Sequence, residues 1–337
     1  MTSKISTISV IGDGGWGTTL AVHLVKKGFA VHLWGPFPKY IRQMARNKYN
    51  SKFLPGVRLT NIQLEEDLTS ALEAGELIVF AIPSKYALET LKGMKKTGVD
   101  FSAKIVVSVT KGFDTGSLKT ISQLMAEQLG EKTPLAVLSG PTIAVEVAKG
   151  IPSTAVLTTP NQTLAAELQD VFNTKQFRVY TNTDVIGVEL GGSLKNVIAI
   201  ACGICDGLGY GTNTKAAILT RGLAEIARLG KAMGANPETF TGLSGLGDLI
   251  TTCFSPNSRN RTVGEKIGKG KNINKILGSM EQVAEGVEAA QAVLKLAHKY
   301  HIPMPITQEV HNILFKDKKP AQAVADLMLR DPKPEST

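Results

Sequence analysis

The sequence predicts an α/β domain with a doubly wound sheet over residues 1–182, followed by an all-helical domain over residues 183–330. Short runs of aliphatic and β-branched residues alternate with helical patterns throughout the first part. Most of these runs are apolar without a break, which is typical of strands covered on both faces, as in a parallel sheet. From Thr183 onward the strand signals vanish and only helical patterns remain.

In the first domain, apolar runs predict the strands and helical patterns between them predict the helices. We expect strands at Ile5–Ile11, Ala30–Trp34, Leu77–Ile82, Ile105–Val109, Leu135–Leu138, Thr154–Leu157 and Phe177–Thr181. We expect helices near Thr18–Lys27, Pro38–Asn47, Tyr86–Lys95, Ser117–Leu129 and Thr163–Phe172. Such alternation indicates strands joined by crossover helices.

The second domain begins with a long helix over Asp184–Asp206, which is apolar on most sides and is therefore expected in the core. The last residues, 331–337, are polar and contain proline, so we expect a loose tail there. Further helices are expected near Asn213–Leu229, Pro237–Phe240, Arg261–Gly268, Val287–Lys299, Pro305–Phe315 and Ala321–Leu329.

The composition is that of a folded protein with a basic surplus. Of the 337 residues, 43% are hydrophobic and 20% charged, and these values exclude a largely disordered chain. The net charge of +9 comes from basic residues that are spread along the chain and form no dense run. A spread of this kind favours small anionic ligands such as phosphates over nucleic acid.

The sequence indicates neither a membrane span nor a metal site. No apolar run approaches the ~20 residues that a span requires, and no signal peptide precedes the first strand, so we expect a cytoplasmic protein. Cys202, Cys205 and Cys253 lack the further ligands of a zinc site, and we interpret them as small core residues. The five histidines form no ligand-spaced cluster.

A glycine-rich loop follows the first expected strand and opens a helix. Gly12, Gly14 and Gly17 have the G-x-G-x-x-G spacing of a Rossmann-type dinucleotide site, whose context is a strand before and a helix after the loop. The first glycine permits a tight turn, the second lets the pyrophosphate approach, and the third allows close helix–strand packing. A helix starting at about Gly15 would direct its free N–H groups at the phosphates. A glycine-rich turn without a ligand is the alternative.

The residues after the second strand bear on which dinucleotide binds. That strand ends at Trp34 without the acid that would favour NAD by binding the ribose hydroxyls. Lys39 and Arg42 lie just beyond, either as a solvated helix start or as contacts to a ribose phosphate. On balance the residues favour NADPH over NADH. Trp16 either covers the cofactor or packs against the protein.

A lysine in an apolar helix is the first candidate for catalysis. Lys195, followed by Asn196, must be paired or face a cavity, because an unpaired buried charge is costly. A desolvated lysine near other cations has a lowered pKa and can exchange a proton with the oxygen of a carbonyl that accepts hydride. A structural salt bridge is the alternative role.

Polar residues interrupt four further glycine-rich or turn-like segments. Asp248 lies among small residues, as a site aspartate or a helix-cap aspartate. Ser258, Arg259 and Asn260 stand at an expected helix start, where hydroxyl, guanidinium and amide groups can bind an anion or Ser258 can act as an N-cap. Lys111 and the segment Ser139–Thr142 follow strand ends, so they should face the cofactor crevice.

Taken in order, these segments resemble the bacterial NAD(P)-dependent sn-glycerol-3-phosphate dehydrogenase family. The resemblance extends from about Ile5 to Leu329, and the lysine and Asn-Ser-Arg-Asn segments are more specific than the glycine loop. The segments are Gly12-Asp-Gly-Gly-Trp-Gly17, Thr110-Lys-Gly112, Ser139-Gly-Pro-Thr142, Gly191-Gly-Ser-Leu-Lys-Asn-Val-Ile-Ala199, Gly245-Leu-Gly-Asp-Leu249 and Asn257-Ser-Arg-Asn260.

The resemblance implies a role for each matched residue. It implies that Lys195 gives and takes the proton at the carbinol oxygen and that Asp248 holds Lys195. Substrate contacts are implied for Lys111, Gly140, Thr142, Lys195, Asp248, Ser258, Arg259 and Asn260, the last three around the phosphate. Cofactor contacts are implied for Gly15, Trp16, Lys111, Ala144, Arg259, Val283 and Glu285, beside the loop glycines.

The activity implied by the resemblance is the reversible reduction of dihydroxyacetone phosphate to sn-glycerol 3-phosphate, which feeds phospholipid synthesis. Family members often carry a basic residue soon after the second-strand tryptophan, where this chain has Gly35-Pro36-Phe37, so the choice between NADPH and NADH stays open. Two alternatives are a related β-hydroxyacid or ketopantoate-type dehydrogenase and a non-enzymatic dinucleotide sensor. Exposed parts of the helical domain could support a homodimer.

Overall fold

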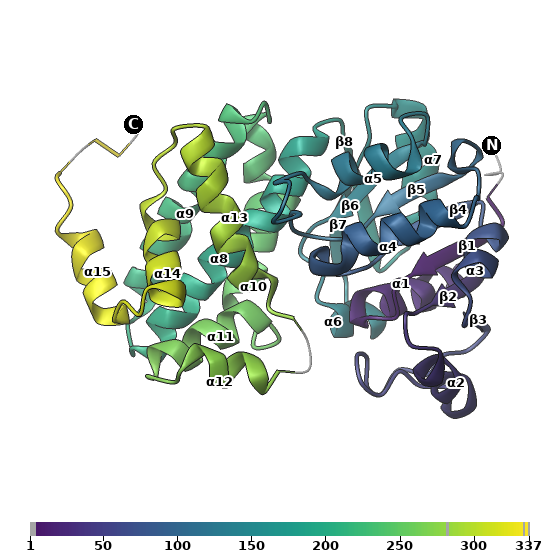
Figure 1. Cartoon of the computed structure of the whole chain (residues 1–337), viewed down its shortest axis with the longest axis horizontal. Helices are drawn as coiled ribbons and strands as arrows, with labels where there is room; N and C mark the ends of the chain where they lie inside the picture. The colour runs from purple at the N-terminus through teal and green to yellow at the C-terminus, as the bar shows by residue number, and fades with distance from the viewer. Residues whose placement is uncertain (1–4, 281–282, 333, 336–337) are drawn as a thin grey trace.

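The protein has two parts that lie side by side (Figure 1). One part is a sheet with helices on both of its faces, and the other consists of helices alone. The structure, a computed structural model, describes residues 5–280, 283–332 and 334–335. The sheet ends at residue 182, and the described residues after it form helices and no further strand, so the predicted fold class is confirmed. The limits of the two domains, 1–182 and 183–330, stay a prediction.

The sheet has eight strands in the order β3-β2-β1-β4-β5-β6-β7-β8. All neighbouring strands are parallel except β6 and β7, which are antiparallel, so the sheet is mostly parallel. The strands are β1 (Thr7–Ile11), β2 (Ala30–Trp34), β3 (Ile62–Glu65), β4 (Leu77–Phe80), β5 (Ile105–Ser108), β6 (Leu135–Ser139), β7 (Ser153–Thr158) and β8 (Phe177–Asn182).

Helices cover both faces of this sheet, as a doubly wound fold requires. Leu20 of α1 and Leu168 of α7 belong to the apolar cluster on one face, whereas Leu72 of α3, Leu91 of α4 and Leu124 of α5 belong to that on the other. The helices of this part are α1 (Gly15–Lys26), α2 (Pro38–Asn47), α3 (Leu68–Ala74), α4 (Ser84–Lys96), the 3-10 turn η1 (Phe101–Ala103), α5 (Ile121–Leu129), α6 (Ala144–Ala148) and α7 (Gln162–Phe172).

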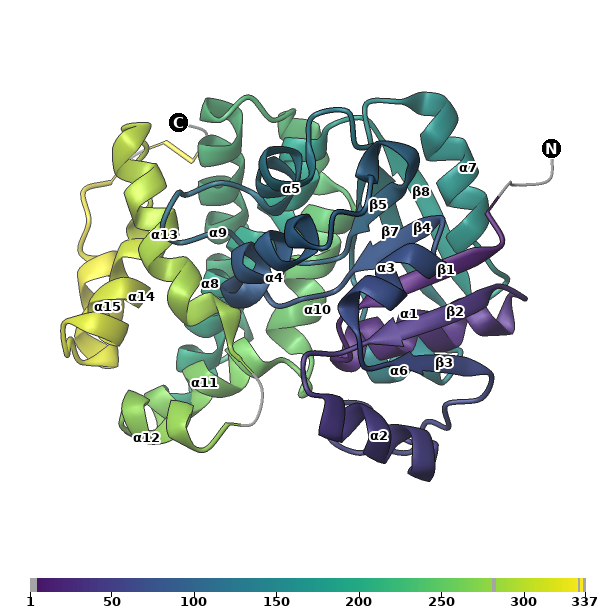
Figure 2. The same ribbon diagram turned by 45° about the vertical axis from the view of Figure 1, so that its right-hand side comes forward.

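The strand order reverses its direction between β1 and β4. The chain leaves β1 towards β2 on one side, and it later returns to add β4 on the other side. In open α/β sheets, ligands bind outside the carboxyl ends of the strands at such a switch point. The glycine loop that follows β1 lies at this point (Figure 2).

Several short elements differ from the prediction for identifiable reasons. β3 was not predicted, because it is a four-residue edge strand whose side chains are mostly half-exposed and thus lacks an apolar run. α5 begins at Ile121 and not at Ser117, because Thr120 and Gln123 form a capping box, while Asp114 binds the amide of Ser117 in a preceding turn. The short helices α3 and α6 were also missed.

The second part is built around α8 (Val185–Gly207), close to the predicted helix. This helix is long and apolar enough to cross a membrane, but 89% of its most apolar window is buried inside the protein. The others are α9 (Thr212–Ala232), the 3-10 turn η2 (Pro237–Thr241), the π-turn η3 (Leu243–Gly247), α10 (Asp248–Phe254), α11 (Arg259–Gly268), α12 (Ile273–Gly278), α13 (Glu285–Lys299), α14 (Pro305–Phe315) and α15 (Pro320–Met328).

The end of the chain follows α15. The described residues of the predicted loose tail, 331–332 and 334–335, lie in no helix or strand, and the Arg221 side chain donates a hydrogen bond to the carbonyl of Glu335. Residues 333 and 336–337 of that tail lie outside the described residues.

Glycines allow α11 to pack directly on α8. A Cβ atom at Gly203 of α8 would lie 2.0 Å from the carbonyl oxygen of Arg261, and one at Gly264 of α11 would lie 2.1 Å from that of Ile200. The two backbones are therefore in contact, without intervening side chains. This approach holds the start of α11 beside the middle of α8, where Lys195 is found.

We predict that Gly203→Ala lowers the free energy of unfolding by about 1–3 kcal/mol, because α11 must move away from α8 to admit the methyl group. Urea unfolding followed by circular dichroism measures the change. Gly278→Ala is the matched control, since no atom lies within 4 Å of a Cβ placed there. Equal stability of the two variants would contradict the account of the α8–α11 contact.

Candidate active site

The glycine loop has the geometry that its spacing predicted. Gly12 has a φ of +125°, and a Cβ atom there would lie 2.6 Å from the Ala81 carbonyl oxygen beyond β4. A Cβ atom at Gly17 would lie 2.0 Å from the Gly12 carbonyl oxygen, so this glycine permits the close packing of α1 on the loop. No atom lies within 4 Å of a Cβ atom placed at Gly14, so a ligand can approach the backbone of this residue.

The start of α1 fits the pyrophosphate of a dinucleotide. The helix begins at Gly15, no side chain caps it at Gly14, and its first turn has no acidic residue. Its first N–H groups are therefore free to bind an anion at the positive end of the helix dipole. Trp16 is half-buried with its ring centroid 6.3 Å from that of Phe177, so it packs against β8.

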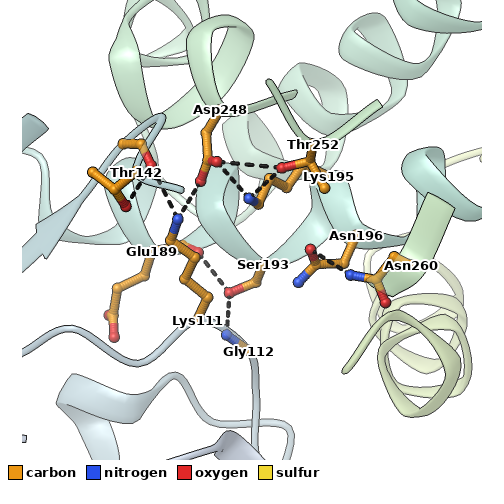
Figure 3. Close-up of polar contacts among 11 residues, drawn as sticks. Lys111, Gly112, Thr142, Glu189, Ser193, Lys195, Asn196, Asp248, Thr252 and Asn260 are labelled. Atoms are coloured by element: carbon orange, nitrogen blue, oxygen red, sulfur yellow. Dashed lines mark hydrogen bonds and ion pairs between the residues drawn. The ribbon is translucent and has the colours of Figure 1, made fainter. Parts of the chain in front are cut away.

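One carboxylate lies between two lysines (Figure 3). Lys195 Nζ is 2.5 Å from Asp248 Oδ1, and Lys111 Nζ is 2.6 Å from Asp248 Oδ2. The side chains of Lys195 and Asp248 are almost fully buried, and that of Lys111 is 18% exposed. Lys195 also donates to Thr252 Oγ1 at 2.6 Å. Asp248 thus compensates two ammonium groups from opposite sides.

The Lys195 amine is tuned towards proton exchange near neutral pH. Burial lowers the pKa of Lys195 from its usual 10.5 to about 8, against the opposing attraction of Asp248. The positive charge of Lys111 adds to this lowering of the pKa. An amine with a pKa near 8 can act as an acid or as a base under physiological conditions.

Lys111 joins the sheet to the helices. It follows β5, and its ammonium also donates to the carbonyl of Gly140, which follows β6, at 3.0 Å. The next residue, Gly112, donates its amide to Ser193 Oγ on α8 at 2.7 Å. Gly192 lets the end of β6 approach α8, since a Cβ atom there would lie 2.8 Å from Ser139 Oγ. The ends of two parallel strands therefore face Lys195.

A second polar group lies next to Lys195 at the start of α11. Asn260 donates to the Asn196 side chain at 2.9 Å and accepts from the amide of Gly286 at 3.0 Å. Ser258 is the N-cap of α11, with its hydroxyl accepting from the amide of Arg261. Arg259 is exposed and donates to the Val283 carbonyl at 2.7 Å. The N-cap interpretation of Ser258 is confirmed.

Glu285, the first residue of α13, faces the same cations. Burial raises the pKa of its carboxyl group, whereas the charges of Arg259, Lys111 and Lys195 act in the opposite direction. Ala144 starts α6 beside α1, and its carbonyl accepts a hydrogen bond from Thr19 of α1 at 3.1 Å.

The predicted site residues fall into two groups by position. Lys111, Gly140, Lys195 and Asp248 are joined by direct hydrogen bonds, and Thr142 reaches the Gly140 carbonyl at 3.3 Å. The segment Ser258–Asn260 is linked to this set through Asn196. The glycine loop, Trp16 and Ala144 form the second group, along α1 and α6.

Thr252 was not among the residues singled out by sequence. α10 was not predicted, so Asp248 stood as an isolated turn residue and its neighbour one helical turn later went unnoticed. A threonine four residues after a site aspartate is the signal that could have identified it, because residues i and i+4 share a helix face.

Other expectations can be compared with the structure directly. Cys202, Cys205 and Cys253 are buried free thiols, as predicted for core residues. Among the described residues, no group of three or more His, Cys, Asp or Glu side chains could hold a metal. Arg42 is paired with Glu66, and Lys39 is exposed, as in a solvated helix start.

Two sequence models, for the two parts of one family, match this chain. The model for the N-terminus of NAD-dependent glycerol-3-phosphate dehydrogenase matches residues 7–165, and the model for its C-terminus matches residues 184–325. The chain belongs to this family. Both halves of the site described above therefore lie within matched regions.

Individual proteins and solved structures that are similar to this chain support its membership of the family. The chain is 47% identical over 331 residues to the glycerol-3-phosphate dehydrogenase (NAD(P)+) of Prosthecochloris aestuarii, covering 97% of this chain and 99% of that protein. The crystal structure of glycerol-3-phosphate dehydrogenase from Coxiella burnetii is 39% identical, with a TM-score of 0.92, over 96% of this chain and 99% of that chain. A ketopantoate reductase from Ralstonia eutropha shares the fold alone, at 13% identity, a TM-score of 0.61 and coverage of 94% and 99% of the two chains.

We predict that Asp248→Asn lowers the free energy of unfolding by about 3 kcal/mol at pH 7, because an amide cannot compensate the two ammonium groups. At pH 9.5 the loss is smaller, since Lys195, with a pKa of about 8, is then neutral. Urea unfolding at both pH values measures this.

The matched control is Glu127→Gln, which removes an ion pair with Lys119. The side chain of Glu127 is 50% exposed and that of Lys119 is 44% exposed. This variant should change stability by less than about 1 kcal/mol at either pH. An Asp248→Asn effect no larger than that of the control would contradict the central role of the carboxylate.

Proposed function

We propose that this chain is an NAD(P)-dependent oxidoreductase that reversibly reduces dihydroxyacetone phosphate to sn-glycerol 3-phosphate. The observation that carries this proposal is the buried Lys195, paired with Asp248 and facing the ends of β5 and β6, in a chain that belongs to the glycerol-3-phosphate dehydrogenase family over nearly its whole length. Carbonyl reduction needs a proton donor in such a position, because charge develops on the oxygen as hydride reaches the carbon.

Lys195 is proposed as the group that exchanges this proton. In the direction of reduction its ammonium form donates to the developing alkoxide, and in the direction of oxidation its neutral form accepts the hydroxyl proton. Asp248 and Thr252 fix the Nζ position through hydrogen bonds of 2.5 and 2.6 Å, which leaves one donor position for the substrate oxygen. Asp248 also balances the charge of Lys111.

The substrate is proposed to lie between the strand ends and the start of α11. Lys111, Gly140 and Thr142 would line it from the sheet, whereas Ser258, Arg259 and Asn260 would surround its phosphate. The guanidinium of Arg259 is exposed and can form two parallel hydrogen bonds with phosphate oxygens. A positive set of this kind supports a phosphorylated substrate.

The cofactor is proposed to lie along the start of α1. Gly12, Gly14, Gly15 and Gly17 would admit the pyrophosphate, with Trp16 and Ala144 beside it. Towards the substrate, Lys111, Arg259, Val283 and Glu285 would border the nicotinamide end. A bound nicotinamide supplies the hydride, and the residues of the chain hold the substrate and move the proton.

The product would serve as the glycerol backbone for phospholipid synthesis, as in the family that the chain resembles. We further propose a cytoplasmic location, consistent with the burial of α8 inside the protein. A homodimer formed through exposed parts of the helical region remains a proposal.

A second candidate function is the reduction of a carboxylate substrate, as in ketopantoate-type enzymes of the same fold. The hydroxyl, guanidinium and amide of Ser258, Arg259 and Asn260 favour the phosphate instead, because they offer more donors than a carboxylate alone would use. A dinucleotide sensor without catalysis would have no need for the Lys195–Asp248 pair.

We predict oxidation of the reduced dinucleotide, followed by absorbance, with dihydroxyacetone phosphate and not with ketopantoate. The reason is that the cationic set around Lys111 and Arg259 recognises the phosphate. Turnover with ketopantoate alone would support the second candidate. Measurable cofactor binding without turnover of either substrate would support the sensor and reject the proposed reaction.

We predict that Lys195→Ala folds but loses turnover by about 10²–10⁴-fold, because Asp248 keeps Lys111 as its counter-charge while the proton donor is lost. In the wild type, the rate of reduction should fall above pH 8 and the rate of oxidation should rise up to about pH 8, since reduction needs the protonated amine and oxidation the neutral one.

Steady-state rates in both directions between pH 6 and pH 10 test this prediction, with circular dichroism as the control for folding. Retained turnover of Lys195→Ala with only a raised KM would exclude Lys195 from the proton transfer.

A further inference from the structure

The glycine loop contains a buried carboxylate that the proposed reaction does not use. Asp13, between Gly12 and Gly14, is only 5% exposed. Its Oδ2 atom has no hydrogen-bond partner within the part of the chain that the structure describes. Burial raises the pKa of Asp13 to about 6, so the side chain is mostly ionised at pH 7 and above. A buried, ionised oxygen without a donor is costly and indicates a missing partner.

Hydrogen bonds hold the backbone of Asp13, whereas its carboxylate atom Oδ2 has no hydrogen-bond partner among the described residues. The Asp13 carbonyl accepts from Thr18 Oγ1 at 3.0 Å and from Asn50 Nδ2 at 2.7 Å. Tyr40 and Lys52 are the titratable groups near the carboxylate, and the charge of Lys52 partly offsets the burial. The Lys52 ammonium lies over the Phe53 ring, 5.0 Å from its centroid. The described residues thus fix the loop without satisfying Oδ2.

The carboxylate lies at the carboxyl end of β2. Gly12 donates its amide to the carbonyl of Trp34, the last residue of β2, at 2.9 Å. A Cβ atom at the next residue, Gly35, would lie 2.4 Å from Asp13 Cγ. Any side chain at position 35 would therefore occupy the place that the Asp13 carboxylate takes.

This position has a known use in dinucleotide-binding sheets. An acid at the end of the second strand binds the hydroxyls of the adenosine ribose, and its place is taken by a basic residue where a 2′-phosphate must be accommodated. Here the strand continues as Gly35-Pro36-Phe37, without an acid. Asp13 brings a carboxylate to the same place from the glycine loop, and Gly35 leaves the room for it.

We infer that Asp13 selects the dinucleotide: its unpaired carboxylate accepts hydrogen bonds from the adenosine ribose hydroxyls and repels a 2′-phosphate, so that the enzyme prefers NADH to NADPH. The inference rests on the proposed function and names the cofactor specificity of that site. It replaces the weaker indication for NADPH from Lys39 and Arg42, because Arg42 is already paired with Glu66.

The test measures binding of each nucleotide without substrate. The chain has two tryptophans: Trp16 lies within the loop, and the Trp34 carbonyl accepts the Gly12 amide, so quenching of their fluorescence by NADH or NADPH reports the two dissociation constants. We expect the wild type to bind NADH about tenfold more tightly or better, in line with charge-assisted hydrogen bonds and like-charge repulsion. Asp13→Asn, which keeps the shape and removes the charge, should reduce this ratio about tenfold or more.

Glu66→Gln is the matched control, since it removes one negative charge from the neighbouring surface and leaves the loop intact. Its ratio should stay near that of the wild type. A wild-type preference for NADPH, or equal ratios for Asp13→Asn and the wild type, would overturn the inference. Binding of neither nucleotide by the wild type would reject the proposed function itself, and this inference with it.

Thermal unfolding separates a ligand role from a structural one. Without nucleotide, Asp13→Asn should melt at or above the wild-type temperature at pH 8, because a neutral amide is less costly to bury than a carboxylate whose pKa is raised. With saturating NADH, the wild type should gain more in melting temperature than the variant. A large loss of stability in the nucleotide-free variant would assign the carboxylate to the fold and overturn the proposed selectivity.

Discussion

Two ammonium groups buried against one carboxylate are the interaction on which the arrangement of this molecule depends. Asp248, the first residue of α10, binds Lys195 of α8 and Lys111 at the end of β5. This one side chain therefore connects the sheet to α8 and α10. Removing Asp248 would leave two ammonium groups uncompensated in a poorly solvated place, which is why the three positions constrain one another. The same confinement lowers the pKa of Lys195 to about 8 and makes the pair useful for proton transfer.

Close backbone contacts make that charge cluster possible. Gly192 admits Ser139 at the end of β6 to α8, and Gly203 admits α11, which brings Asn260 to Asn196 beside Lys195. Larger side chains at these glycines would separate the elements by ångströms, more than a hydrogen bond tolerates. The function of the site therefore depends on residues that have no functional groups.

Local sequence patterns were sufficient for the long elements and insufficient for the short ones. Continuous apolar runs located seven of the strands, and α2 and α14 have the predicted bounds. β3 is a half-exposed edge strand, and α10 is a short helix in a glycine-rich stretch, so neither has a periodic signal of its own. The antiparallel direction of β7 follows from its connection to β6 and leaves no trace in composition.

The sequence by itself determined the fold class and singled out Lys195 and Asp248, because polar residues in apolar or glycine-rich segments conflict with local packing unless they serve a site. The tertiary structure alone decided that Asp248 also pairs with Lys111, 137 residues away, and that Thr252 completes the lysine's partners. It alone placed the Asp13 carboxylate at the end of β2. Pairing across such separations depends on how elements pack in space, and a pattern read along the chain carries no information on distances between its distant parts.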